Sequence, residues 1–133
     1  MKKTLLLAAA LACSGAVAQE KQVWACQEIT KGQGFSYKDG AWVEASFTSL
    51  NYLVTIDGSN SKYGHSGKEY TTNCELTPDY AANLHFRCGD NTGGTVLLNP
   101  DTKLAVISEG LGGIIMNANR DTVSIRLLQC TKF

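Results

Sequence analysis

The sequence predicts an all-β fold, a small antiparallel β-barrel or sandwich of about eight strands with one short helix, stabilised by disulfides. Apolar and polar residues alternate through most of the chain, whereas a helical period is almost absent. Turn-forming Gly, Asn, Asp and Pro residues separate the short apolar runs. Four cysteines follow a predicted export signal, and an even number favours disulfides.

The first eighteen residues predict export. Lys2 and Lys3 precede a short apolar run, and Ala16-Val17-Ala18 forms an A-x-A cleavage site. The run is too short to span a bilayer, and no later segment reaches spanning length. We therefore expect a signal peptide over 1–18 and a single all-β domain over 19–133, located in the periplasm or secreted.

A lipid anchor is the minor alternative for the same segment. Leu11-Ala12-Cys13 resembles the cleavage box of bacterial lipoproteins, in which the cysteine is lipidated. Ala10 stands where such boxes usually carry leucine, however, and the A-x-A site lies downstream. We therefore favour the form without an anchor over one attached through Cys13.

Each element is predicted from local pattern. Alternation and turn spacing predict strands over residues 22–29, 52–56, 69–76, 84–88, 95–98, 103–108 and 122–130, together with a hairpin over 34–47. Loops are expected at 57–61 and 63–67, and a flexible break at 110–113 precedes Ile114-Ile115-Met116. The one helix is expected over 78–83, where Thr77, Pro78 and Asp79 fit an N-cap, a first-turn proline and an early acidic residue.

The clearest turn signal is Asp39-Gly40. A type I′ turn needs positive φ at both central residues, which Asp tolerates and Gly prefers. This register places Tyr37 opposite Trp42 in a non-hydrogen-bonded pair, where side chains approach closely.

The cysteines predict two disulfides, Cys74–Cys88 and Cys26–Cys130, among three possible connectivities. The first closes a loop of about fifteen residues and contributes roughly 3 kcal/mol in the chain-entropy model. The second joins the first strand to the last, as suits a closed sheet. Zinc is the rival use, but the cysteines lack the close pairs that zinc sites normally have.

The pattern G-F-x-Y-x-x-G-x-W occurs at Gly34, Phe35, Tyr37, Gly40 and Trp42. Together with the C-terminal Cys130-x-x-Phe133, it resembles a group of small secreted bacterial proteins that remain uncharacterised. The resemblance spans most of the chain after residue 18. Its motifs are aromatic and structural, so it implies no activity, cofactor or site.

Composition and motifs give little sign of catalysis or metal binding. The 12 basic and 12 acidic residues are scattered, so we expect no nucleic-acid partner. His65 and His85 have no metal-ligand spacing or adjacent nucleophile. Gly64-His65-Ser66-Gly67 departs from a nucleophile elbow at Lys68, and the Asp57 loop lacks the glycine and glutamate of a calcium site. We expect no catalytic residue, metal or cofactor.

Aromatic residues are concentrated in the first half of the domain. The ligand-lining candidates are Trp24, Phe35, Tyr37, Trp42 and Tyr52. They serve either as core and cross-strand pairs, which we favour, or as the wall of a binding mouth.

We therefore expect a non-catalytic binding module, for example an inhibitor of a cell-envelope hydrolase. The alternative is a lipocalin-like carrier of a small apolar ligand. The partner is thus an unidentified protein or a small apolar molecule.

Overall fold

The computed structural model describes residues 20–79, 81–110 and 121–133. These form ten strands and one 3-10 turn. The elements are β1 (Gln22–Glu28), β2 (Gly32–Lys38), β3 (Ala41–Phe47), β4 (Asn51–Ile56), η1 (Gly58–Asn60), β5 (Ser61–His65), β6 (Lys68–Pro78), β7 (Leu84–Gly89), β8 (Gly94–Asn99), β9 (Leu104–Glu109) and β10 (Thr122–Lys132).

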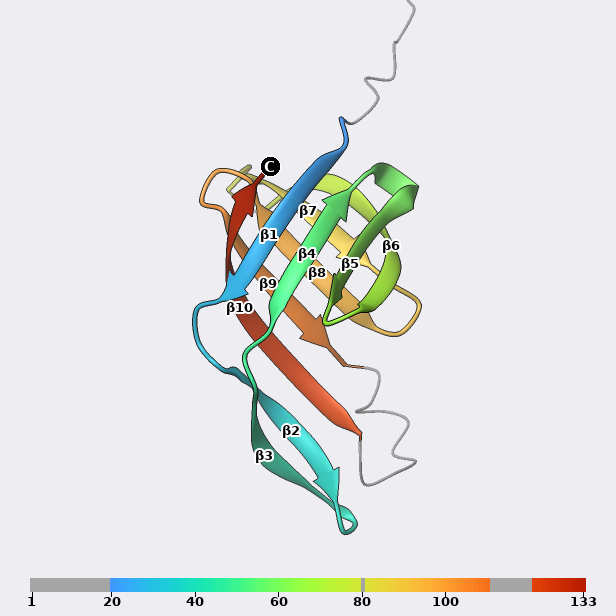
Figure 1. The fold of residues 1–133 in the computed structure, drawn as a ribbon, viewed down its shortest axis with the longest axis vertical. Helices are drawn as coiled ribbons and strands as arrows, with labels where there is room; N and C mark the ends of the chain where they lie inside the picture. The colour runs from blue at the N-terminus through green and yellow to red at the C-terminus, as the bar shows by residue number, and fades with distance from the viewer. Residues whose placement is uncertain (1–19, 80, 111–120) are drawn as a thin grey trace, which may run out of the picture.

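Eight of the strands close into an antiparallel barrel (Figure 1). The sheet order runs β1-β4-β5-β6-β7-β8-β9-β10, and β1 pairs with β10 to complete the circle. The predicted all-β class is therefore confirmed, and the structure selects a barrel over a sandwich. Because the barrel closes, it buries one face of every strand around a single core.

The hairpin β2–β3 lies outside this circle and projects beyond the barrel end at which β1 finishes, called here the lower end (Figure 1). It is attached through β10. One edge of β10 pairs with β9, and the other edge pairs with both β1 and β2. Residues Leu128 to Lys132 of β10 pair with β1, and Thr122 to Ile125 pair with β2. One long strand therefore both closes the barrel and carries the hairpin.

The barrel core is built from inward-facing residues that alternate with outward ones along each strand. Its apolar members are Trp24, Tyr52, Val54, Ile56, Tyr63, Phe86, Val96, Leu98, Ala105, Ile107 and Leu128, together with four cysteines. The disulfides Cys26–Cys130 and Cys74–Cys88 join directly paired residues on β1–β10 and β6–β7, at Cα–Cα distances of 4.0 and 4.1 Å. Both predicted linkages are confirmed, and they fit an oxidising compartment.

The turn between β7 and β8 is fixed to this core by Asp90. The Tyr63 hydroxyl donates to Asp90 Oδ2 at 2.6 Å, while the Thr92 and Gly94 amides donate to Oδ1. Burial opposes ionisation of Asp90, but these hydrogen bonds hold the pKa of its carboxyl below the usual value. A Cβ at Gly94 would lie 2.0 Å from the Tyr63 hydroxyl oxygen, so this close approach requires glycine.

Two elements differ from the sequence prediction. The helix over 78–83 is wrong: β6 continues to Pro78, and the described residues of the following segment form a turn. Asp79 Oδ1 accepts from the amides of Ala81 and Asn83, so the presumed helix start is a side-chain-stabilised turn joining β6 to β7. The loop over 63–67 is also wrong in part, because β5 extends to His65 and pairs with both β4 and β6.

Some predictions lie outside the described residues, namely the signal peptide over 1–18 and the apolar run Ile114-Ile115-Met116. Within the part of the chain that is described, no helix has the length and apolar character needed to cross a membrane.

Candidate binding surface

The hairpin is shaped by its turn. Asp39 and Gly40 have φ values of 50° and 83°, the positive values that the sequence predicted for a type I′ turn. Tyr37 pairs directly with Trp42, and their ring centroids lie 5.3 Å apart with tilted planes. The turn and the register are therefore confirmed.

The outer face of the hairpin continues the outer face of the barrel and carries several apolar side chains beside Glu44. Alternation along β2 places Phe35 and Tyr37 on the same side, where Phe35 pairs with Val123 of β10. Phe35 is 47% exposed, and Ile125, two residues beyond Val123, is 59% exposed. We call Phe35, Tyr37, Trp42, Val123 and Ile125 the hairpin face.

A shallow depression of about 400 Å³ lies within the hairpin face, between β2 and β10. Phe35, Val123 and Ile125 contribute apolar walls, and Glu44 contributes a charged one. The strands come close here, since a Cβ at Gly34 would lie 1.8 Å from the Val123 carbonyl oxygen. Glycine at position 34 therefore lets the hairpin lie flat against β10.

The base of the hairpin is held by Arg126, whose side chain points into the lower end of the barrel. Its guanidinium forms a buried ion pair with Glu28 at the end of β1. It also donates to the Thr48 carbonyl at 3.2 Å and lies 5.5 Å from the ring centroid of Phe47. Arg126 thus contacts the ends of β1 and β3 and the β3–β4 connection, and these contacts position the hairpin.

Buried polar groups surround this ion pair. Among the described residues, Glu28 Oε2, Tyr52 Oη, His65 Nδ1 and Arg126 Nε are shielded from solvent and lack a hydrogen-bond partner. The Tyr52 and His65 rings meet edge to face, with centroids 5.0 Å apart. Burial raises the pKa of Tyr52 to about 12 and lowers the pKa of His65. Burial thus disfavours the charged form of both side chains, and solvent does not reach the four atoms.

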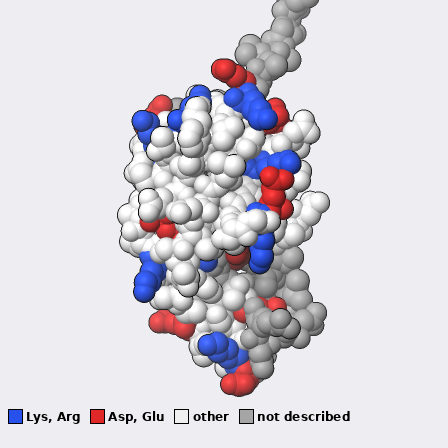
Figure 2. All heavy atoms as spheres, in the orientation of Figure 1, with Lys and Arg blue, Asp and Glu red and all other residues white. Residues whose placement is uncertain are grey.

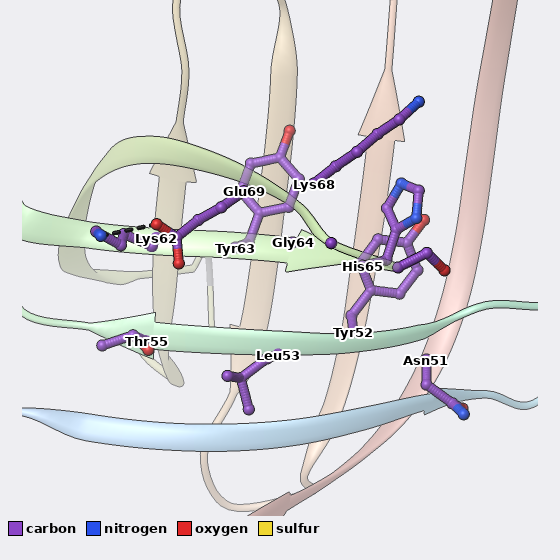
Figure 3. Close-up of a pocket in the computed structure, with 12 residues that line it drawn as sticks. Asn51, Tyr52, Leu53, Thr55, Lys62, Tyr63, Gly64, His65, Lys68 and Glu69 are labelled. Atoms are coloured by element: carbon purple, nitrogen blue, oxygen red, sulfur yellow. Dashed lines mark hydrogen bonds and ion pairs between the residues drawn. The ribbon is translucent and has the colours of Figure 1, made fainter.

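A second depression, of about 430 Å³, lies over β4, β5 and β6 (Figure 3). Lys62 and Glu69 form an exposed ion pair of 2.7 Å at one part of it, and Tyr52 and His65 lie side by side at another. An exposed pair of this kind contributes little to stability and is screened by salt. Charged side chains, among them Lys62, Lys68 and Glu69, therefore line part of this depression.

The five aromatic candidates predicted from the sequence lie in two different parts of the structure. Trp24 and Tyr52 are buried inside the barrel, whereas Phe35, Tyr37 and Trp42 lie together on the hairpin. They do not line one common mouth. Val123, Ile125 and the positioning residue Arg126 were not identified from sequence. Strand parity could have found them, since Cys130 faces inward and alternation then places Arg126 inside and Ile125 outside.

Beside the hairpin face, metal-binding potential and surface charge are the remaining features of the described residues. Within residues 20–79, 81–110 and 121–133, no group of three or more His, Cys, Asp or Glu side chains could hold a metal ion. Figure 2 shows Lys and Arg side chains interspersed with Asp and Glu on the face in view. The hairpin face is an exposed, largely apolar surface on a disulfide-linked barrel. No family model, curated protein or solved structure matches the chain.

Proposed function

We propose that this protein is an exported, non-catalytic binding module that recognises a partner protein through the hairpin face. The observation that carries the proposal is that the exposed Phe35 of the projecting hairpin and the exposed Ile125 of the adjoining strand β10 lie on the same face of the sheet. Aromatic side chains are enriched at protein interfaces, and contiguous exposed apolar groups mark interaction sites. The predicted signal peptide and the disulfides support a location outside the cytoplasm.

The hairpin also has the shape of an inhibitory element. Its two-residue turn makes a narrow tip, and the Arg126 contacts hold its base against the barrel. A pre-organised loop loses little conformational entropy when it enters a cleft. We therefore extend the proposal to inhibition of a cell-envelope hydrolase by insertion of this hairpin.

The carrier alternative has less support. Val54, Ile56, Val96, Leu98 and Ile107 have no exposed surface and pack against one another inside the barrel. A carrier of the lipocalin type keeps space at the equivalent place for one small ligand. The apolar area that is open to a partner lies on the hairpin face instead.

The test compares three forms of the domain over 19–133 as immobilised baits in an envelope extract. These are the wild type, the Phe35→Ser/Ile125→Ser variant and a Leu53→Ser control on β4, where Leu53 is 52% exposed. We expect the wild type and the control to retain the same partner, and the double variant to lose it at least tenfold. Equal retention by all three would refute the proposal.

The captured partner then tests the inhibitory role. If it is a hydrolase, its turnover should fall when wild-type protein is added and should be unaffected by Phe35→Ser/Ile125→Ser. If the hydrolase binds the protein and keeps its full rate, inhibition is refuted and the proposed binding is not.

A further inference from the structure

Inward-facing polar side chains gather at the lower end of the barrel. β1 ends there with Glu28, β4 carries Tyr52 as its second residue, and β5 ends with His65. Alternation along β9 and β10 directs Glu109 and Arg126 inward at the same end. We call Glu28, Tyr52, His65, Glu109 and Arg126 the lower-end cluster. Each of these residues comes from a different strand of the barrel.

Part of the hydrogen-bonding capacity of this cluster is unused. Glu28 Oε2 and His65 Nδ1 are two of the shielded polar atoms without a partner, and the Tyr52 ring meets the His65 ring edge to face. Buried polar groups in native proteins are almost always paired, because an unpaired group has lost its hydration without compensation. The cluster therefore contains a spare buried acceptor on Glu28 and a spare ring nitrogen on His65.

His65 is the member of the cluster whose charge changes in mildly acidic solution. Its side chain is only partly buried, so protons reach the ring from solvent although the Nδ1 atom is shielded. Burial lowers the pKa of His65, and the charges of Lys68 on β6 and Arg126 also oppose protonation. The carboxylates of Glu109 and Glu28 favour it. The neutral ring therefore predominates above about pH 6.5, and the charged ring forms as the pH falls below that value.

We propose that the lower-end cluster is an acid-sensitive switch, in which protonation of His65 weakens the Glu28–Arg126 ion pair and loosens the hairpin. A protonated imidazole carries a hydrogen on both ring nitrogens, so the shielded Nδ1 becomes a charged donor that requires an acceptor. The unpartnered Oε2 atom makes Glu28 that acceptor, and Glu28 is also the partner of Arg126. The new positive charge repels the Arg126 guanidinium as well. Both effects act against the same ion pair.

Arg126 links the cluster to the hairpin. Its guanidinium donates to the Thr48 carbonyl and lies over the Phe47 ring, so it holds the base of β3. The residues that precede it in β10, Thr122 to Ile125, pair with β2. Displacement of Arg126 therefore weakens the attachment of both hairpin strands, whereas the Cys26–Cys130 disulfide keeps β1 and β10 together. The hairpin is thus the part of the fold that opens locally in acid.

Hydrogen exchange followed by mass spectrometry tests the switch. Exchange of the amides in β2 and in residues 122–125 is measured at about pH 7.5 and about pH 5, on either side of the histidine range, and corrected for the intrinsic rate. The amides of β7 serve as the reference for global stability. We expect the hairpin amides of the wild type to lose protection about tenfold more than the reference in acid.

Two matched variants assign the effect to one histidine. The His65→Gln variant should keep the protection of its hairpin amides in acid, and the His85→Gln control should behave as the wild type. Wild-type protection that does not change with pH, or an equal loss in His65→Gln, would overturn the inference. The unsubstituted protein gives a second measurement, because the midpoint of the loss should coincide with the titration midpoint of the His65 ring by NMR. Two clearly different midpoints would also overturn it.

A third variant tests the route through Glu28. Glu109 is the other carboxylate that favours the charged ring, and it accepts a hydrogen bond from the Ser124 hydroxyl. We expect Glu109→Gln to retain the acid-induced loss of protection. Abolition of the loss in this variant would make Glu109 the partner of protonated His65 and overturn the proposed route. All these measurements use the free protein, so their outcome is independent of the proposed function.

Discussion

The two disulfides permit a controlled test of how loop length stabilises this barrel. Both join directly paired residues of neighbouring strands, and all four cysteines are buried. They differ in sequence separation, which is 104 residues for Cys26–Cys130 and 14 for Cys74–Cys88. Replacing either pair by alanine removes the same atoms from similar surroundings. The difference between the two variants therefore isolates the constraint on the unfolded chain.

The chain-entropy model gives the expected magnitude. A closed loop of about 100 residues contributes about 4.7 kcal/mol and one of about 15 residues about 3 kcal/mol, a difference of about 1.7 kcal/mol. With a urea m-value of about 1.5 kcal/mol/M, the unfolding midpoint of Cys26→Ala/Cys130→Ala should lie about 1 M below that of Cys74→Ala/Cys88→Ala. The assay is urea unfolding followed by tryptophan fluorescence. Equal midpoints, or the reverse order, would refute the reasoning.

Four further predictions concern the Gly40 turn, the buried ion pair and the histidines. Gly40→Val should destabilise the fold by about 1–3 kcal/mol in urea unfolding, because a β-branched residue is strained at φ 83°; an unchanged midpoint would contradict this. Arg126→Met should lower stability by about 3–5 kcal/mol by leaving Glu28 buried without its partner, and adding Glu28→Leu should restore most of it; no restoration would count against the buried pair as the cause. The His65→Ala/His85→Ala variant should retain partner binding in the pull-down. Loss of binding with an intact fold would contradict the proposed non-catalytic binding module and favour an enzyme. Burial holds the pKa of His65 below 6.5, so the unfolded chain binds more protons and stability should fall as pH drops below about 6.5; His65→Ala should weaken that dependence in urea unfolding at successive pH values.

Local signals account for the parts of the fold that sequence predicted well. The Asp39-Gly40 turn needs only two residues with positive φ, so its register follows without knowledge of the rest of the chain. The pairing of Cys26 with Cys130 followed from the expectation that the first and last strands of a closed sheet meet. Both predictions rest on constraints that few alternative structures satisfy.

Ambiguous local patterns explain the errors. Thr77-Pro78-Asp79 fits a helix start, but the Asp79 carboxylate satisfies a tight turn with the same chemistry. β5 was missed because it is five residues long and contains Gly64, whose Cβ would lie 2.1 Å from the Lys68 carbonyl oxygen. Glycine there permits close strand approach, whereas in sequence it resembles a loop residue.

The hairpin face could not be predicted from the type of each residue alone. Ile125 is apolar and exposed, whereas Arg126 is charged and buried, the reverse of what composition favours. Only the parity of β10 relative to Cys130 determines which side each residue faces. The composition of the hairpin face therefore depends on how β10 is oriented in the sheet.

The position of β10 also determines the order in which the chain can fold. β10 is the last strand along the chain, yet it pairs with β9, β1 and β2. The segment from β4 to β9 can pair and can form Cys74–Cys88 before β10 is available. Barrel closure, hairpin attachment and the Cys26–Cys130 bond must all wait for it. The Cys26–Cys130 bond therefore reports closure of the barrel, whereas Cys74–Cys88 reports only the pairing of β6 with β7.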